Sequence, residues 1–302
     1  MFFHTAGIEV ALWIPPLVAL VVSFFTSMGG VSGAFLLLPF QMSVLGYTSP
    51  SVSATNQFYN VVAIPGGVYR YLREGRMVWP LCWAVIIGTL PGVFLGAIIR
   101  VTWLPDPVNF KLFAALVLLY IGWRLVRDLF GGAKRAPAGA RDAAEGKRST
   151  SRTRVVHFSA RRIEYEFNGK SFSASTPGVI VLSLIVGIAG GVYGIGGGSI
   201  MAPVFVTFFG LPVHTIAGAA LMGTCVTSVA AVIFFSCLAP FFPGMSVSPD
   251  FALGALFGLG GLVGMYLGAR CQKFMPARYI KWMLVIVILF VAGKYFWVFL
   301  DV

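Results

Sequence analysis

The chain has 302 residues, of which 58% are hydrophobic and only 11% are charged, and its mean hydropathy is +0.88. Soluble domains carry roughly 25% charged residues, so this composition excludes a soluble protein and predicts an integral membrane protein. The net charge of +12 does not indicate nucleic-acid binding, because the charges fall in loops between apolar runs and not on a folded basic face.

Apolar segments separated by polar turns predict an all-α polytopic membrane protein. A helix needs about 20 residues to span a bilayer, and the second, sixth and seventh segments are shorter than that. The two glycine-linked pairs that contain them are therefore either two spans each or hairpins of half-helices. The segments cover residues 8–26, 31–45, 52–71, 78–99, 108–126, 178–190, 199–209, 215–239, 251–269 and 279–300.

Basic residues gather in alternate turns and predict the orientation. Residues 127–176 contain eleven Lys or Arg against five acidic residues. By the positive-inside rule this loop is cytoplasmic, and the basic turns at residues 70–76 and 270–281 fit the same side. This threading places both termini outside and starts the two halves from opposite sides of the membrane.

A glycine motif occurs once in each half. Gly29-Gly30-Val31-Ser32-Gly33 resembles the start of the run at residues 190–199, and a proline and a glycine follow each copy at matching positions, Pro39 with Gly46 and Pro203 with Gly210. The offset after the glycines is constant at 164 residues. Together with the opposite orientation, this predicts two inverted repeats of about five segments with glycine-broken half-helices. The expected domains are a first repeat at residues 1–126, a cytoplasmic loop at 127–176 and a second repeat at 177–302.

The cytoplasmic loop contains two stretches that alternate apolar and polar residues, 155–158 and 163–167. Such alternation predicts β-strands, and Asn168-Gly169 after them is a hairpin signal. We expect a small β-ribbon that serves as a passive connector, with a regulatory or partner role as the alternative.

The candidate site lies where the two glycine-broken segments meet. No acidic or basic residue falls in the middle of an apolar segment, and Arg100, Lys111 and Lys294 sit near outer ends, where they can snorkel to the surface. Glycine-exposed N–H groups and half-helix N-termini favour an anion over a cation. The expected substrate-binding residues are Gly30, Ser32, Gly33, Thr55, Asn56, Gln57, Asn60, Gly191, Gly194, Gly196, Gly197, Gly198, Ser199 and Thr224.

The polar residues of this set also have a structural interpretation. Side chains such as Thr55, Asn56 and Thr224 can form hydrogen bonds between helices without touching a substrate. His214, at an expected inside end, fits a capping role better than a proton relay.

Enzymatic motifs are missing from the sequence. There is no GxSxG, no HExxH, no paired carboxylates and no P-loop, and the glycine run lacks the βαβ context of a nucleotide loop. The four cysteines have no metal-ligand spacing. No catalytic residue, metal or cofactor is therefore expected.

The run GGVYGIGGGSIMAPVF, its shorter copy GGVSGAFLLLPF and the small-residue stretch at 210–224 resemble the TauE/SafE sulfite-exporter family of bacterial membrane transporters. The resemblance covers both membrane halves. It implies a carrier of the bacterial inner membrane that exports sulfite or a small organosulfonate, and we expect alternating access around the site between the two broken segments. The alternatives are a carrier for another small anion and, from another class, an intramembrane structural or biogenesis factor without flux. The expected partners are the small anion and the lipid bilayer, with no nucleic acid. The oligomeric state stays open, a homodimer being one alternative.

Overall fold

The computed structural model describes residues 1–28, 32–73, 75, 77–130, 153–167, 169–196, 198–211, 213–271 and 277–300. Helices dominate these residues, and two small antiparallel sheets accompany them. Four helices within the described part of the chain are long and apolar enough to cross a membrane: Trp79–Thr102, Thr176–Tyr193, Thr215–Phe241 and Phe251–Gly268. The expectation of a polytopic helical membrane protein is confirmed at this level.

The elements follow in chain order. Two strands of two residues each, β1 (Phe2–Phe3) and β2 (Ile8–Glu9), come first. They are followed by the helices α1 (Ile14–Met28), α2 (Ala34–Ser43), α3 (Ser51–Ala63), α4 (Pro65–Arg73), α5 (Trp79–Thr102) and α6 (Pro107–Phe130). Strands β3 (Arg154–Phe158), β4 (Arg162–Phe167) and β5 (Lys170–Ser175) come next. They lead into α8 (Thr176–Tyr193), α9 (Gly198–Phe209), α10 (Val213–Leu238), the short 3₁₀ helix η1 (Ala239–Phe241), α11 (Phe251–Cys271) and α12 (Ala277–Leu300).

Several expected segment bounds are wrong. The first helix begins at Ile14, because Ile8 and Glu9 pair with Phe2 and Phe3 as strands. The third segment is two helices, since Pro65 has no N–H to continue the ladder of α3 and instead starts α4. The sixth segment is longer than expected: α8 continues through Gly190 and Gly191 to Tyr193 and has 18 residues.

Helix α9 has 12 residues and nearly matches the expected segment 199–209, whereas α2 has 10 and is shorter than the expected segment 31–45. Each is followed by a glycine in the left-handed region, Gly46 with φ of 72° and Gly210 with φ of 63°. A left-handed residue ends a helix and costs glycine no steric strain. The matching glycines of the two sequence copies thus stand in matching conformations.

Glycine faces bring two pairs of helices into close contact. Gly92 of α5 lies so near α8 that an added Cβ would come within 2.9 Å of Ile188 N. Glycines spaced by four residues allow helix backbones to approach in this way inside a membrane. The glycines concerned are Gly88, Gly92 and Gly96 of α5, against the carbonyls of Ile180, Leu184 and Ile188 in α8, and Gly260, Gly264 and Gly268 of α11, against those of Pro16, Leu20 and Phe24 in α1.

The expected strands of the central loop are present, and the structure adds a third strand, β5, that the alternation pattern did not indicate. The order is β3-β4-β5, and Phe167 pairs with Lys170 across a two-residue turn that contains Gly169 with φ of 71°. Asn168 lies outside the described residues. One face of the sheet is buried, and the hydroxyl of Tyr165 lies 2.7 Å from that of Thr215 near the start of α10.

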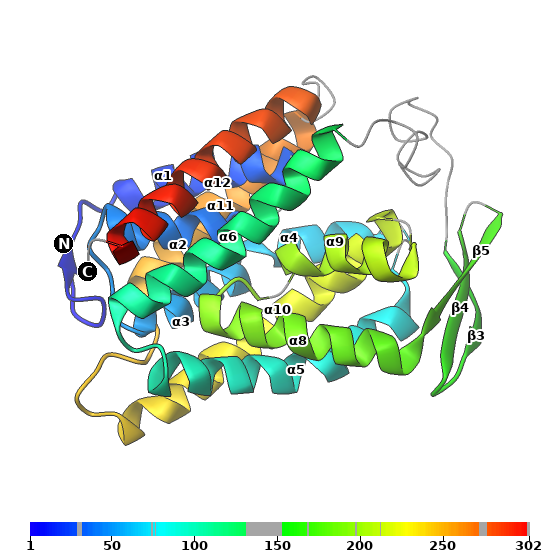
Figure 1. Cartoon of the computed structure of the whole chain (residues 1–302), viewed down its shortest axis with the longest axis horizontal. Helices are drawn as coiled ribbons and strands as arrows, with labels where there is room; N and C mark the ends of the chain where they lie inside the picture. The colour runs from blue at the N-terminus through cyan, green and yellow to red at the C-terminus, as the bar shows by residue number, and fades with distance from the viewer. Residues whose placement is uncertain are drawn as a thin grey trace.

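The sheet and the chain ends mark opposite ends of the molecule. Figure 1 shows β3–β5 at one end, and the N-terminal strands with the end of α12 at the other. Between them, large apolar side chains such as Leu95, Leu119, Leu259 and Phe290 are exposed on the outer helices. Such a surface suits contact with lipid tails, and the helices in Figure 1 run broadly along the axis between the two ends.

Candidate functional site

The break between α8 and α9 begins at Gly194, which has φ of 85°. The N–H groups of Gly194 and Ile195 both donate to the Gly190 carbonyl, at 2.9 and 3.1 Å, so a left-handed glycine closes α8. A Cβ on Gly194 would lie 2.5 Å from the Ser53 carbonyl oxygen. Only glycine fits here, both for its φ and for its contact with α3.

One face of α3 binds the carbonyl end of α8. Carbonyls in the last turn of a helix can accept further hydrogen bonds, and here buried side chains of the neighbouring helix supply donors. Ser53 Oγ donates to Val192 O at 2.8 Å, Gln57 Nε2 to Gly190 O at 3.1 Å and Asn60 Nδ2 to Gly194 O at 3.5 Å.

Helix α10 closes the break from another side. Thr224 Oγ1 donates to the Gly196 carbonyl at 2.6 Å, and Ser228 Oγ donates to Gln57 Oε1 at 2.8 Å. Gly196 has φ of 69°, and a Cβ there would meet the Thr224 methyl group and lie 2.8 Å from Ser228 Oγ. The backbone between α8 and α9 is therefore held by hydroxyl and amide groups from α3 and α10.

The first break is held from α3 as well. Asn56 Nδ2 donates to the Ala34 carbonyl at 2.9 Å, and Ser32 Oγ accepts from the Ala34 N–H at 3.3 Å. Gly33 is packed so closely that a Cβ would lie 2.8 Å from the Tyr59 hydroxyl.

The two breaks lie next to each other. The hydroxyl of Tyr193, the last residue of α8, donates to the Phe35 carbonyl in the first turn of α2 at 2.8 Å. Asn56 and Asn60, one turn apart on α3, bind one break each. Both asparagines are fully buried, so this meeting point is closed to solvent in the structure.

Several expected site residues are thus brought together: Ser32, Gly33, Asn56, Gln57, Asn60, Gly194, Gly196 and Thr224. Gly191 instead packs against α5, where a Cβ would lie 2.6 Å from Val93 O. Thr55 faces a different cluster, with its hydroxyl 2.8 Å from that of Tyr47 and accepting from Asp250 N at 2.9 Å. Gly30 and Gly197 lie outside the described residues. Gly198 and Ser199 are described only as the backbone at the start of α9.

The N–H groups that were expected to face an anion are partly used within the chain. Those of Ala34, Gly194 and Ile195 already donate to oxygens of the protein. Asn60 is the more adaptable group, because its bond to Gly194 is long at 3.5 Å and its Oδ1 has no partner. A rotation of this amide would present its two N–H donors to an incoming anion at the loss of one weak bond.

Arg100 contradicts the expectation that the basic residues near helix ends snorkel to the surface. Arg100 lies in the last turn of α5, and its side chain is fully buried. The Cζ atom of its guanidinium lies 3.8 Å from the centroid of the Phe110 ring. Sequence reasoning missed it because the position of a residue near a helix end does not say which way its side chain points.

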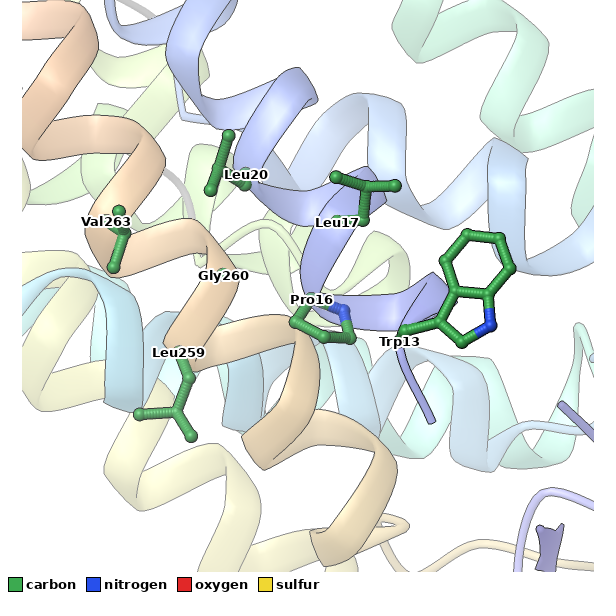
Figure 2. Close-up of a pocket in the computed structure, with 7 residues that line it drawn as sticks. All are labelled: Trp13, Pro16, Leu17, Leu20, Leu259, Gly260 and Val263. Carbon is green, nitrogen blue, oxygen red and sulfur yellow. The ribbon is translucent and has the colours of Figure 1, made fainter. Parts of the chain in front are cut away.

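Other site classes find little support within the described residues. No group of three or more His, Cys, Asp or Glu side chains is placed there to hold a metal ion. A groove between α1 and α11, shown in Figure 2, is lined by Trp13, Pro16, Leu17, Leu20, Leu259, Gly260 and Val263. None of the expected site residues lines it, and its apolar walls offer nothing to bind a charge.

Comparison with known proteins bears on one point. No curated protein and no solved structure matches the chain. The protein family described as Sulfite exporter TauE/SafE matches residues 16–295, from the first turn of α1 through most of α12, and this range includes both glycine breaks. The match covers far more than half of the sequence, and the chain therefore belongs to the TauE/SafE sulfite exporter family.

Proposed function

We propose that this protein exports a small anion, sulfite or an organosulfonate such as sulfoacetate, across the inner membrane of a bacterium. The observation that carries the proposal is the buried contact between the two glycine breaks, bridged by the polar face of α3. Irregular backbone at membrane depth is tolerated where protein surrounds it or a pathway passes, and paired breaks in two halves point to a transporter site. Membership of a family of exporters supports the same function and a role other than catalysis.

The proposal includes two inverted repeats, residues 1–126 and 177–302, with the segment 127–176 between them. The helix contacts support it: α1 packs along α11 and α8 along α5, while α3 packs on α11 and α10 on α5. If α1 corresponds to α8, α5 to α11 and α3 with α4 to α10, each of these contacts has a counterpart. The glycines spaced by four in α5 and in α11 fit the same correspondence. Alternating access would then move one set of helices against the other around the breaks.

The proposed orientation has the sheet β3–β5 in the cytoplasm and the termini outside. It rests on the positive-inside rule. The position of the sheet and the N-terminal strands at opposite ends of the molecule supports it (Figure 1). The oligomeric state is left open.

Flux in proteoliposomes tests the function. The purified protein should release entrapped sulfite and sulfoacetate faster than protein-free vesicles, and slower release is expected for the bulkier sulfonate. In cells, Ser171→Cys on the exposed side of β5 should react with an impermeant maleimide only after permeabilisation, in a background without the four native cysteines. Release equal to that of empty vesicles for every small oxyanion would favour a structural or biogenesis factor instead.

A further inference from the structure

Arg100 is a buried cation with no carboxylate partner among the residues that the structure describes. Its Nε donates to Ser53 Oγ at 3.3 Å, and its Nη1 donates to the Leu104 carbonyl in the turn after α5. Its Nη2 is buried and has no hydrogen-bond partner. The guanidinium is thus held from two sides and keeps the N–H donors of one nitrogen unused.

Two acids in this part of the molecule are already engaged by backbone N–H groups. Asp106, two residues after Leu104, accepts from Val108 N and Asn109 N at 3.0 Å each. Asp250 accepts from Leu253 N at 3.0 Å and from Ala6 N at 3.3 Å. Among the described residues, neither acid is a recorded partner of Arg100. A buried charge without a counter-ion is costly, and the Phe110 ring and two neutral oxygens compensate only in part.

The position of Arg100 connects it to the glycine breaks. Ser53, which accepts from Arg100, donates in turn to the Val192 carbonyl in the last turn of α8. One hydroxyl group therefore separates the guanidinium from the end of the broken helix. The last turn of α5, which contains Arg100, lies toward the end of the molecule that carries the N-terminal strands (Figure 1), the proposed outer side.

We propose that Arg100 binds the transported oxyanion on the outer side of the breaks through Nη2, and that it selects anions over cations and neutral solutes. This inference rests on the proposed function and assigns the positive charge of the pathway to one residue. A guanidinium offers planar, paired donors that match two oxygens of a sulfite or sulfonate group. Ionisable residues inside membrane segments commonly mark the path of an ion.

The test compares three purified variants with the wild type. Arg100→Gln keeps a hydrogen-bonding side chain without charge, and Arg100→Lys keeps the charge without the planar fork. Lys111→Gln is the matched control, because Lys111 is a partly exposed cation near the same end of the molecule, in the first turns of α6. Thermal unfolding is followed by tryptophan fluorescence in sulfite or sulfoacetate, against sodium chloride of equal ionic strength, and flux is measured in proteoliposomes.

We expect Arg100→Gln to raise the anion concentration for half-maximal stabilisation at least tenfold and to lower flux at least tenfold. Arg100→Lys should recover part of both, and Lys111→Gln should match the wild type. If Arg100 only clamps the helices, Arg100→Gln will lower the unfolding temperature without anion but keep the wild-type anion response, which overturns the inference. Wild-type flux that Arg100→Gln leaves unchanged overturns it too, while the proposed function stands. A wild type that neither responds to nor transports either anion contradicts both.

Discussion

Gly196 is a position in the break where a larger residue does not fit. Its φ of 69° lies in the left-handed region, and Thr224 binds its carbonyl from α10. A methyl group added here would meet the Thr224 methyl group, with Ser228 Oγ at 2.8 Å. Conformational strain and a side-chain clash therefore act together at one position.

We predict that Gly196→Ala lowers the unfolding temperature and removes most of the flux. The left-handed conformation alone costs an L-residue on the order of 1–3 kcal/mol, and the clash displaces Thr224 from the carbonyl that it binds. Thermal unfolding and sulfite flux measure the two effects. Gly210→Ala is the control, since Gly210 shares the left-handed φ but has no atom within 4 Å of an added Cβ. Equal losses of unfolding temperature and flux in the two variants would mean that the contact of Gly196 with α10 contributes to neither.

Side-chain direction is the part of the site that the sequence could not predict. The motif indicated Asn56, Gln57 and Asn60 correctly as polar groups near the breaks, because amides are costly in a membrane unless something binds them. Thr55 and Gly191 were assigned to the same place, yet Thr55 faces Asp250 and Gly191 faces α5. These choices depend on the rotation of α3 and α8 about their axes, which is set by packing against distant segments.

At the level of elements, the features that depend on local sequence were predicted correctly, and those that depend on packing between distant segments were not. Strand alternation, the turn at Gly169 and the end of α9 are local, and the sequence predicted them. The continuation of α8 through Gly190 and Gly191 was not predicted, because glycine is a poor helix former on its own. Here the Val93 carbonyl of α5 lies against Gly191, and contact between two backbones outweighs the intrinsic propensity.

That contact leads to a prediction about α5. Gly92→Ala should destabilise the protein, because the new methyl group would meet the Leu184 carbonyl and lie 2.9 Å from Ile188 N, both of which are backbone atoms and cannot rotate away. Within a helix, alanine is otherwise favoured over glycine by about 1 kcal/mol. Gly293→Ala in α12, where nothing lies within 4 Å, should therefore leave the unfolding temperature unchanged or raise it. Thermal unfolding in detergent compares the two variants. A rise of the unfolding temperature in both would show that the close contact between α5 and α8 at Gly92 does not contribute to stability.

At the scale of the whole molecule, the distribution of acids bears on how export is driven. The helices α1 to α5 and α8 to α12 contain no Asp or Glu within the ranges that the structure gives them, and the buried Asp250 stands before α11 and binds backbone N–H groups. Proton-coupled carriers usually need a titratable carboxylate at membrane depth. Histidine is the side chain type that changes charge near neutral pH, and His214 lies near the start of α10 at the proposed inner end.

We predict that the membrane potential alone drives export. Sulfite is an anion near neutral pH, and an inside-negative potential favours its exit by about 2.3 kcal/mol per charge per 100 mV, so no added ion gradient is required. Flux should be measured in vesicles with a potassium-clamped potential and no pH gradient, for the wild type and for His214→Gln. Both should transport faster as the side that contains the anion becomes more negative, because only the charge of the substrate couples to the field. If flux ignores the potential but follows an imposed pH gradient, and His214→Gln removes that response, the carrier is proton-coupled through His214 and the prediction is wrong.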